Sequence, residues 1–337
     1  MTRSLLFPSL VLWFCLSTIP SRTLAESKLD TTHVSPFFDG HQLEGASIHG
    51  HEVHDKRKRG GRNSLLKRCD ASKHSHGSKT PASAQYSGDS TSVFPAESKK
   101  WGLAWPNGDA SYLANFARPK VRYLYTWSPY LPSTASEHGM EGIPMLWGWS
   151  QVDDFSRVVV QGYATRVLGM NEPNEPTQSF MSPQDGISLW KHYIDPLKTQ
   201  GYYLISPACT NDQAGLDWMQ SFVEGCTDCT IDAIAFHFYG TDPRAFVEHA
   251  TILHETYNKP IWVTEFADQN FGGSGGQASM PDIYAFQSSV IEFVENTPWI
   301  EAAFPFGVMH DMQGVDEGNA LLTEDEWPTS LAYNYFG

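Results

Sequence analysis

The chain has 337 residues and a formal net charge of −15. Residues 1–100 hold 14 of its 23 basic and 9 of its 38 acidic residues, so the remaining 237 residues carry a net charge of −20. A region this acidic repels nucleic-acid phosphates and anionic membranes, which argues against polyanions as ligands. Neutral polymers remain, and the 11 Trp, 14 Tyr and 19 Phe would suit sugar rings, although most of them must fill the core.

Residues 1–25 are typical of a signal peptide. Arg3 precedes an apolar stretch that is too short to cross a bilayer and is interrupted by Pro8, and Thr23-Leu24-Ala25 supplies a small-residue cleavage site. The C-terminal residues lack the pattern of a hydrophobic anchor tail. We therefore expect a secreted protein, extracellular or associated with a cell wall, that does not bind membranes once the signal is removed.

Residues 26–99 differ in composition from the rest of the chain. They are rich in His, Ser, Gly and Lys, and they lack hydrophobic periodicity, which predicts a disordered pro-segment and linker. The dibasic pairs within 56–59 and at Lys67-Arg68 are typical of processing sites, and a merely basic linker is the alternative. The His residues of this segment are spaced too irregularly for a compact metal site, which favours a polar tail.

From residue 100 onward, short apolar segments alternate with amphipathic ones. Eight short strands separated by helices predict an α/β fold, a (β/α)8 TIM barrel over 100–337. A doubly wound sheet is the alternative, but no glycine-rich phosphate loop follows the first strand. The expected strands are 101–105, 121–127, 143–147, 166–170, 202–206, 233–238, 261–264 and 302–308, and the expected helices include 186–199, 216–224, 245–257 and 281–296.

Two glutamates come directly after predicted strands. Glu172 follows the fourth strand in Asn-Glu-Pro, and Glu265 follows the seventh in Thr-Glu-Phe. The carboxyl ends of barrel strands form the active site in TIM barrels, and paired carboxylates there are typical of glycoside hydrolysis. A helix-capping charge and a salt-bridge partner are the alternative readings of the two residues taken singly.

Four motifs carry a resemblance to a known family. Residues 101–105 (WGLAW), 168–174 (LGMNEPN), 226–232 (CTDCTID) and 262–267 (WVTEFA) are similar to those of the Asl1-like glycosyl hydrolases, glycoside hydrolase family 128. The resemblance extends over roughly residues 100–335, and it implies a retaining TIM-barrel hydrolase with endo-β-1,3-glucanase activity. It assigns Glu172 as the acid/base and Glu265 as the nucleophile, without a metal or another cofactor.

The resemblance also implies roles for the neighbours of these glutamates. Asn171 would bond the sugar 2-hydroxyl, and Tyr239 would orient the nucleophile. His237 would line the sugar subsite, with a hydrogen-bonded core histidine as the alternative. At residues 304–307 the chain has Phe-Pro-Phe-Gly where many members of the clan carry a tryptophan.

Four tryptophans lie at or just beyond the ends of the first three strands. At the barrel mouth they would form stacking platforms for sugars, whereas in the core they would only pack. We favour the platform for Trp105 and Trp147 and leave both readings open for Trp127 and Trp149.

Cys226 and Cys229 are spaced as C-x-x-C. Zinc binding would need a second ligand pair, so secretion favours a disulfide. The simplest pairing is Cys226 with Cys229, although Cys69 and Cys209 leave other connectivities open.

These observations predict a monomeric glycoside hydrolase, and the resemblance implies that it cleaves β-1,3-glucan polysaccharides or oligosaccharides. Another retaining β-glycanase of the same clan, such as a mannanase or a β-1,4-glucanase, shares the carboxylate chemistry. A non-catalytic cell-wall glucan-binding protein is a third hypothesis, and it would have no need of two glutamates.

Overall fold

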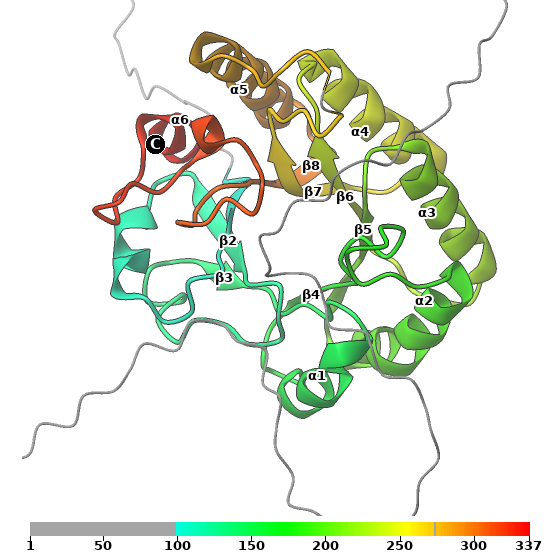
Figure 1. The fold of residues 1–337 in the computed structure, drawn as a ribbon. Helices are drawn as coiled ribbons and strands as arrows, with labels where there is room; N and C mark the ends of the chain where they lie inside the picture. Colours follow the sequence, from blue (N-terminus) through cyan, green and yellow to red (C-terminus); the bar gives the residue numbers. More distant parts are fainter. Residues whose placement is uncertain (1–98, 273) are drawn as a thin grey trace, which may run out of the picture. The chain divides into compact units, whose positions relative to one another are not determined.

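The computed structural model describes residues 99–272 and 274–337. The predicted signal peptide and almost all of the predicted pro-segment lie outside these residues. The described chain is an α/β fold whose eight parallel strands curl into a barrel-like sheet, as the sequence predicts, with the helices arranged around it (Figure 1). The strands are β1 (Trp101–Ala104), β2 (Val121–Tyr125), β3 (Glu141–Gly142), β4 (Arg166–Leu168), β5 (Tyr203–Cys209), β6 (Ala233–Tyr239), β7 (Ile261–Ala267) and β8 (Ile300–Pro305).

The sheet closes between its two end strands. The strand order is β3-β2-β1-β8-β7-β6-β5-β4, which leaves β3 and β4 at the ends. A parallel bridge between Met145 and Leu168 joins the segment after β3 to β4. The amide of Leu146 donates to Leu168 O at 3.1 Å, and the amide of Leu168 donates to Pro144 O at 3.0 Å. This seam completes the ring of strands.

The third strand is shorter than predicted and ends before the predicted range begins. The sequence predicts 143–147, but the regular strand is Glu141–Gly142. Pro144 has no amide to donate, so a continuous hydrogen-bond ladder cannot pass through it. The amides of Ile143 and Met145 still bond to Leu124 O and Ser128 O, and the segment therefore keeps its place in the barrel wall.

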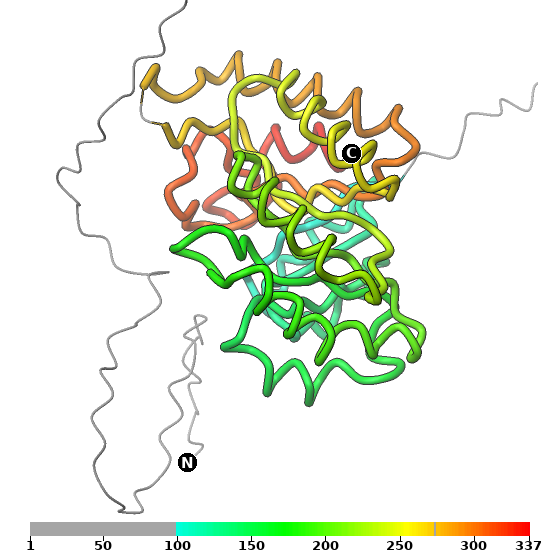
Figure 2. The backbone as a smooth tube through the Cα atoms, turned by 90° about the vertical axis from the view of Figure 1, so that its right-hand side faces the viewer, coloured from blue at the N-terminus to red at the C-terminus, as the bar shows by residue number. Residues whose placement is uncertain are grey.

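The helices alternate with the strands and pack outside them. Figure 2, which views the right-hand side of Figure 1, shows α3 and α4 in front of the strands. The predicted helix at 186–199 is divided because Pro196 interrupts regular α-helical bonding. The helices are α1 (Val152–Val158), α2 (Pro183–Leu189), α3 (Gln213–Gly225), α4 (Pro243–Tyr257), α5 (Met280–Asn296) and α6 (Ser330–Phe336), with shorter turns η1 (Ser111–Phe116), η2 (Trp149–Gln151), η3 (Trp190–Ile194), η4 (Asp195–Gln200) and η5 (Glu317–Asn319).

The buried apolar side chains of the described chain form three clusters, of which the two larger ones are layers on either side of the barrel wall. The outer layer fills the space between strands and helices. The inner layer fills the barrel itself and is rich in aromatic side chains, among them Tyr123, Tyr125, Trp262 and Phe304. The barrel interior is thus packed, as in other TIM barrels, and the site must lie above this packing at the strand ends.

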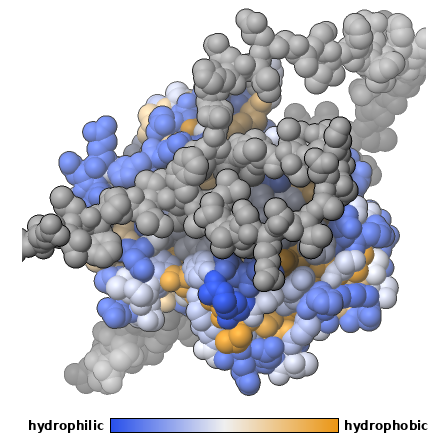
Figure 3. All heavy atoms as spheres, turned by 60° about the horizontal axis from the view of Figure 1, so that its bottom comes forward, coloured by the Kyte–Doolittle hydropathy of each residue, from blue (hydrophilic) through white to orange (hydrophobic). Residues whose placement is uncertain are grey.

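The surface of the described chain shows small apolar patches between polar residues on the face in Figure 3. Among residues 99–272 and 274–337, no helix has the length and apolar character that crossing a membrane requires.

Candidate active site

Glu172 and Glu265 lie at the C-terminal ends of their strands. The amide of Glu172 donates to Ala208 O at 2.8 Å, which holds this residue against β5 just beyond the end of β4. Glu265 is part of β7 itself. Their exposed fractions are 7% and 6%, so both carboxyls are buried. Glu172 has a φ of 42°, a left-handed conformation that non-glycine residues adopt mainly where function or surrounding structure requires it.

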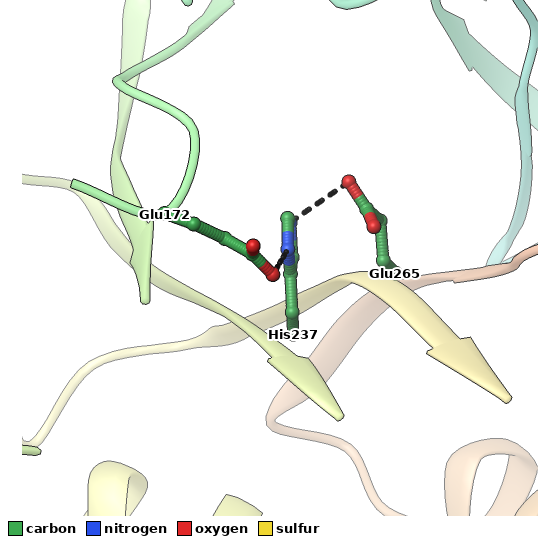
Figure 4. A group of neighbouring side chains, drawn as sticks. All are labelled: Glu172, His237 and Glu265. Atoms are coloured by element: carbon green, nitrogen blue, oxygen red, sulfur yellow. Dashed lines mark hydrogen bonds and ion pairs between the residues drawn. The ribbon is translucent and has the colours of Figure 1, made fainter. Parts of the chain in front are cut away.

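His237 lies between the two glutamates (Figure 4). Its Nδ1 is 2.7 Å from Glu172 Oε1, and its Nε2 is 3.4 Å from Glu265 Oε1. The second contact is an ion-pair distance without hydrogen-bond alignment, since Nε2 has no hydrogen-bond partner among the described residues. One oxygen of Glu172, one ring nitrogen of His237 and one oxygen of Glu265 all lie within 4.8 Å of one another. The two carboxylates therefore face one site.

The two glutamates favour the charged form of the His237 ring. Burial acts to lower the pKa of His237, but the charge of Glu265, followed by the hydrogen bond and charge of Glu172, outweighs it and raises that pKa. A proton on this ring would offset part of the repulsion between the two carboxylates. His237 is buried and hydrogen-bonded, as the alternative of a core histidine predicts. Its hydrogen-bond partner, however, is Glu172 of the candidate site.

Hydrogen-bond donors surround the carboxylate of Glu265. Tyr239 OH donates to Oε2 at 2.6 Å, and the indole Nε1–H of Trp127 donates to Oε1 at 2.7 Å. Tyr125 OH donates to the carbonyl of Thr264 at 2.9 Å and lies 3.5 Å from Oε1. These contacts fix the orientation of the carboxylate.

The electrostatics of Glu265 combine opposing effects. Burial is the largest and raises the pKa of Glu265, and the charge of Glu172 adds to that rise. The charge of His237 and the hydrogen bonds from Tyr239 and Trp127 act in the opposite direction, and the net pKa remains raised. The pKa of Tyr239 is also raised, by burial and then by the charge of Glu265, so its hydroxyl stays protonated and able to donate.

In the described chain, one group of side chains has ligand atoms close enough together to hold a metal ion. It consists of Glu172, His237 and Glu265. Nδ1 of His237 is hydrogen-bonded to Glu172, so that atom already has a partner within the protein.

Asn171 precedes Glu172 and is almost completely buried. Its Nδ2 donates to Gln178 Oε1 at 3.0 Å, whereas its Oδ1 has no partner within the described structure. A buried acceptor without a donor is suited to a ligand hydroxyl.

The structure separates the four tryptophans. The platform prediction for Trp105 is wrong: its exposed fraction is 0%, its Nε1–H donates to Gly108 O at 2.9 Å, and its ring packs against Phe116 in the outer core. Trp127 and Trp147 are half-buried above the inner layer. Trp149 is 46% exposed.

Several site residues were not singled out from the sequence. Gln151 is buried and connects two tryptophan backbones, since its Nε2 donates to Trp127 O at 3.0 Å and its Oε1 accepts from the amide of Trp147 at 3.1 Å. Phe180 is 60% exposed and has a φ of 22°. Phe271 packs its ring against Tyr239. The one available signal was their location in loops after predicted strands.

The structure contains a disulfide between Cys226 and Cys229 at the end of α3. Cys209 is a buried free thiol. Cys69 lies outside the described residues.

Comparison with known proteins gives two matches at the level of sequence. Residues 102–335 match the family model described as the glycosyl hydrolase catalytic core. The alkali-sensitive linkage protein 1 of Schizosaccharomyces pombe is 32% identical over 236 residues, which cover 67% of this chain and 42% of that protein. The match thus spans less than half the length of that relative.

Solved structures with the same fold include enzymes and binding proteins. An exo-β-1,3-glucanase of family 128 (subgroup VI) from Aureobasidium namibiae has a TM-score of 0.64 at 22% identity, over 72% of this chain and 97% of that one. A curdlan-specific exo-β-1,3-glucanase (subgroup III) from Blastomyces gilchristii, in complex with glucose, has a TM-score of 0.58 at 26% identity, over 72% and 99%. An oligosaccharide-binding protein (subgroup VII) from Cryptococcus neoformans has a TM-score of 0.60 at 24% identity, over 74% and 97%.

Proposed function

The chain belongs to the glycosyl hydrolase catalytic-core family, and on this premise we propose that it is a secreted, retaining endo-β-1,3-glucanase. The resemblance to family 128 carried by its motifs is confirmed at the level of the family. Glu172 is proposed as the acid/base and Glu265 as the nucleophile.

The proposal rests on the spacing of two buried carboxylates. One oxygen of Glu172 and one of Glu265 lie within 4.8 Å of each other. Retaining enzymes hold their carboxyl groups about 5–5.5 Å apart, whereas inverting enzymes need about 6.5–9.5 Å to admit a water between carboxylate and sugar. The spacing here supports direct attack on the sugar.

The surroundings of each glutamate support its role. Glu265 accepts hydrogen bonds on both oxygens, which favours the ionised form that a nucleophile requires. Glu172 is bonded on Oε1 to His237, which can take up or return a proton. Glu172 is therefore the better placed of the two for proton transfer.

The reaction then proceeds in two steps. Glu265 attacks the anomeric carbon while Glu172 protonates the departing glycosidic oxygen, which leaves a glycosyl ester on Glu265. Glu172 next takes a proton from water, and the resulting hydroxide equivalent attacks the same carbon and frees Glu265. Asn171 Oδ1, which lacks a partner, would accept a bond from a sugar hydroxyl during both steps.

A β-1,3-glucan is the substrate suggested by the relatives. The glucanases compared above act on β-1,3-glucan, and one of them was solved with glucose bound. Secretion is proposed from residues 1–25. A non-catalytic glucan binder is the second candidate, because a protein of similar fold is an oligosaccharide-binding protein.

The deciding experiment is the product profile of the purified chain on laminarin, with mannan and carboxymethylcellulose for comparison. Release of mixed laminarioligosaccharides with β-configured new ends, seen by ¹H NMR before mutarotation, is expected. Release of glucose alone would contradict endo action, and α-configured ends would contradict retention. Binding of laminarin without cleavage would establish the second candidate, and cleavage of mannan or carboxymethylcellulose in place of laminarin would indicate another β-glycanase of the clan.

A further inference from the structure

Trp127 makes a contact that a sugar platform does not need. It follows β2, and its indole Nε1–H donates to Glu265 Oε1 at 2.7 Å. Tyr239 OH holds the other oxygen at 2.6 Å. The carboxylate is therefore held at both oxygens by residues from two different strands.

The backbone and the ring of Trp127 are both fixed. Its φ of 53° is in the left-handed region, and Gln151 Nε2 bonds its carbonyl. The ring lies 4.9 Å from that of Tyr125 and 6.1 Å from that of Phe306. Phe306 also packs edge-on against Tyr239, at 5.9 Å. One phenylalanine, directly after the end of β8, thus supports both donors to Glu265.

The indole differs chemically from every other group that faces Glu265. Tyr125 from β2, His237 and Tyr239 from β6, and Glu172 beyond β4 can all gain or lose a proton. An indole N–H is a donor only and does not titrate. Its bond therefore always favours the ionised carboxylate, against the effects of burial and of the charge of Glu172.

We propose that Trp127 is a positioning residue for the nucleophile, and that its indole N–H fixes Glu265 Oε1 so that the carboxylate remains ionised and aimed at the sugar. The inference rests on the proposed role of Glu265. The Trp127 side chain acts through that residue, and stacking against the substrate is not required for this role.

The first test replaces Trp127 by Phe, which retains an aromatic ring and removes the donor. The pKa of Glu265, read from ¹³C NMR of glutamate-labelled protein and assigned with E265Q, is expected to rise. The acidic limb of the kcat profile should move to higher pH with it, and kcat should fall by about 10²-fold while KM changes little. An unchanged pKa and pH profile would overturn the proposal.

Trp262→Phe is the matched control. Trp262 Nε1–H donates to Glu301 Oε2 at 2.8 Å, an indole-to-glutamate bond within the inner layer of the barrel. Trp262 is fully buried, so W262F loses at least as much packing as W127F. W262F should leave the pKa of Glu265 in place, and an equal rise in both variants would mean that general loosening of the barrel is the cause.

A measurement on the wild-type chain avoids dependence on any tryptophan variant. The indole proton of Trp127, followed in ¹⁵N-tryptophan protein, should shift with pH in step with the Glu265 carboxyl, and E265Q should abolish that shift. An indole proton that ignores the state of Glu265 would overturn the proposal. These NMR measurements do not require turnover. If the chain did not cleave laminarin, the proposed function would be wrong, but the titrations would still decide whether Trp127 holds the carboxylate of Glu265.

Discussion

The ring of Phe304 occupies the space in which Gly102 would carry a side chain. A Cβ placed on Gly102 would lie 2.0 Å from Phe304 Cε1. Strand β1 can therefore approach β8 only because this residue has no side chain.

Gly102→Ala should consequently destabilise the barrel by about 1–3 kcal/mol or more, because the inner layer has no room for the added methyl group. Urea unfolding followed by tryptophan fluorescence measures the loss. The double variant G102A/F304L, which removes the obstructing ring, should recover part of it. If G102A were as stable as the wild type, the close approach of β1 and Phe304 would be wrong.

Replacing each proposed catalytic carboxylate should have a distinct effect. E265Q lacks a nucleophile and should lose nearly all turnover on every substrate. E172Q should lose roughly 10²–10⁴-fold on laminarin but form the glycosyl-enzyme readily from an aryl glucoside whose leaving group needs no proton. Steady-state and burst kinetics separate these cases.

E175Q, in the same loop as Glu172, is the control and should keep wild-type activity. Its side chain accepts a hydrogen bond from Thr177 and forms no hydrogen bond or ion pair with His237 or Glu265 in the described structure. Unchanged turnover in E172Q or in E265Q would remove that residue from its proposed role.

Two exposed aromatic residues belong to segments that are bonded to Asn171, the neighbour of Glu172 in the chain, and they are suited to further sugar units. Asn171 is bonded by its backbone to Trp147 O and to the amide of Ser179. Trp149 begins η2 two residues after Trp147, and Phe180 directly follows Ser179. A Cβ on Gly148 would lie 2.9 Å from Ser179 Cβ, so the two segments touch. W149A and F180A should each raise KM for laminarin roughly fivefold, equivalent to about 1 kcal/mol, and change KM for laminaribiosides little.

The control for these variants is Tyr333→Ala. Tyr333 is also exposed, but it contacts Arg118 ahead of β2, at the opposite end of the strands. Equal effects of Y333A and W149A on KM would show that the change does not come from a lost sugar contact.

Asp268 gives a prediction about pH and stability. Burial, with the charges of Asp282 and Asp316, raises the pKa of Asp268 to about 6. Because the folded pKa lies above the unfolded value of about 3.9, the folded state binds the proton more tightly. Stability linked to this group is therefore present below about pH 4 and is lost as the pH rises toward 6 and beyond.

Asp268→Asn should accordingly stabilise the chain at pH 7.5 relative to the wild type, with the difference vanishing near pH 4. Asp268 Oδ1 has no hydrogen-bond partner in the part of the chain that the structure describes, so the substitution breaks no bond at that atom. Thermal unfolding at the two pH values measures the difference, with the exposed Asp325→Asn as control. A stabilisation equal at both pH values would refute the assignment.

The sequence predicts the parts of the site that depend on strand ends. Glu172 and Glu265 follow apolar segments, and parallel strands bring such positions to one rim. Trp105 also follows such a segment, yet its indole turns outward to the Gly108 carbonyl and packs on η1. The direction of the Trp105 ring depends on packing between segments that are distant in the sequence, and the local sequence pattern does not predict such packing.

The positions of Trp127 and His237 depend on long-range contacts in the same way. The left-handed backbone of Trp127 aims its ring at Glu265, and it is held by Gln151, a residue without a motif of its own. His237 lies in an otherwise apolar strand, β6. Its hydrogen bond to Glu172 forms only because the fold brings β6 close to the segment that follows β4. The assignments for residues 1–98 stay predictions.

The seam between β3 and β4 has a consequence for the two carboxylates. Glu265 is borne by β7, which is paired along its length with β6 and also bonded to β8, whereas Glu172 follows the short strand that borders the seam. Thermal motion of the barrel should therefore displace Glu172 more than Glu265. The side of the site that carries Glu265 should stay in place, and the side that carries Glu172 should move as substrate binds and product leaves.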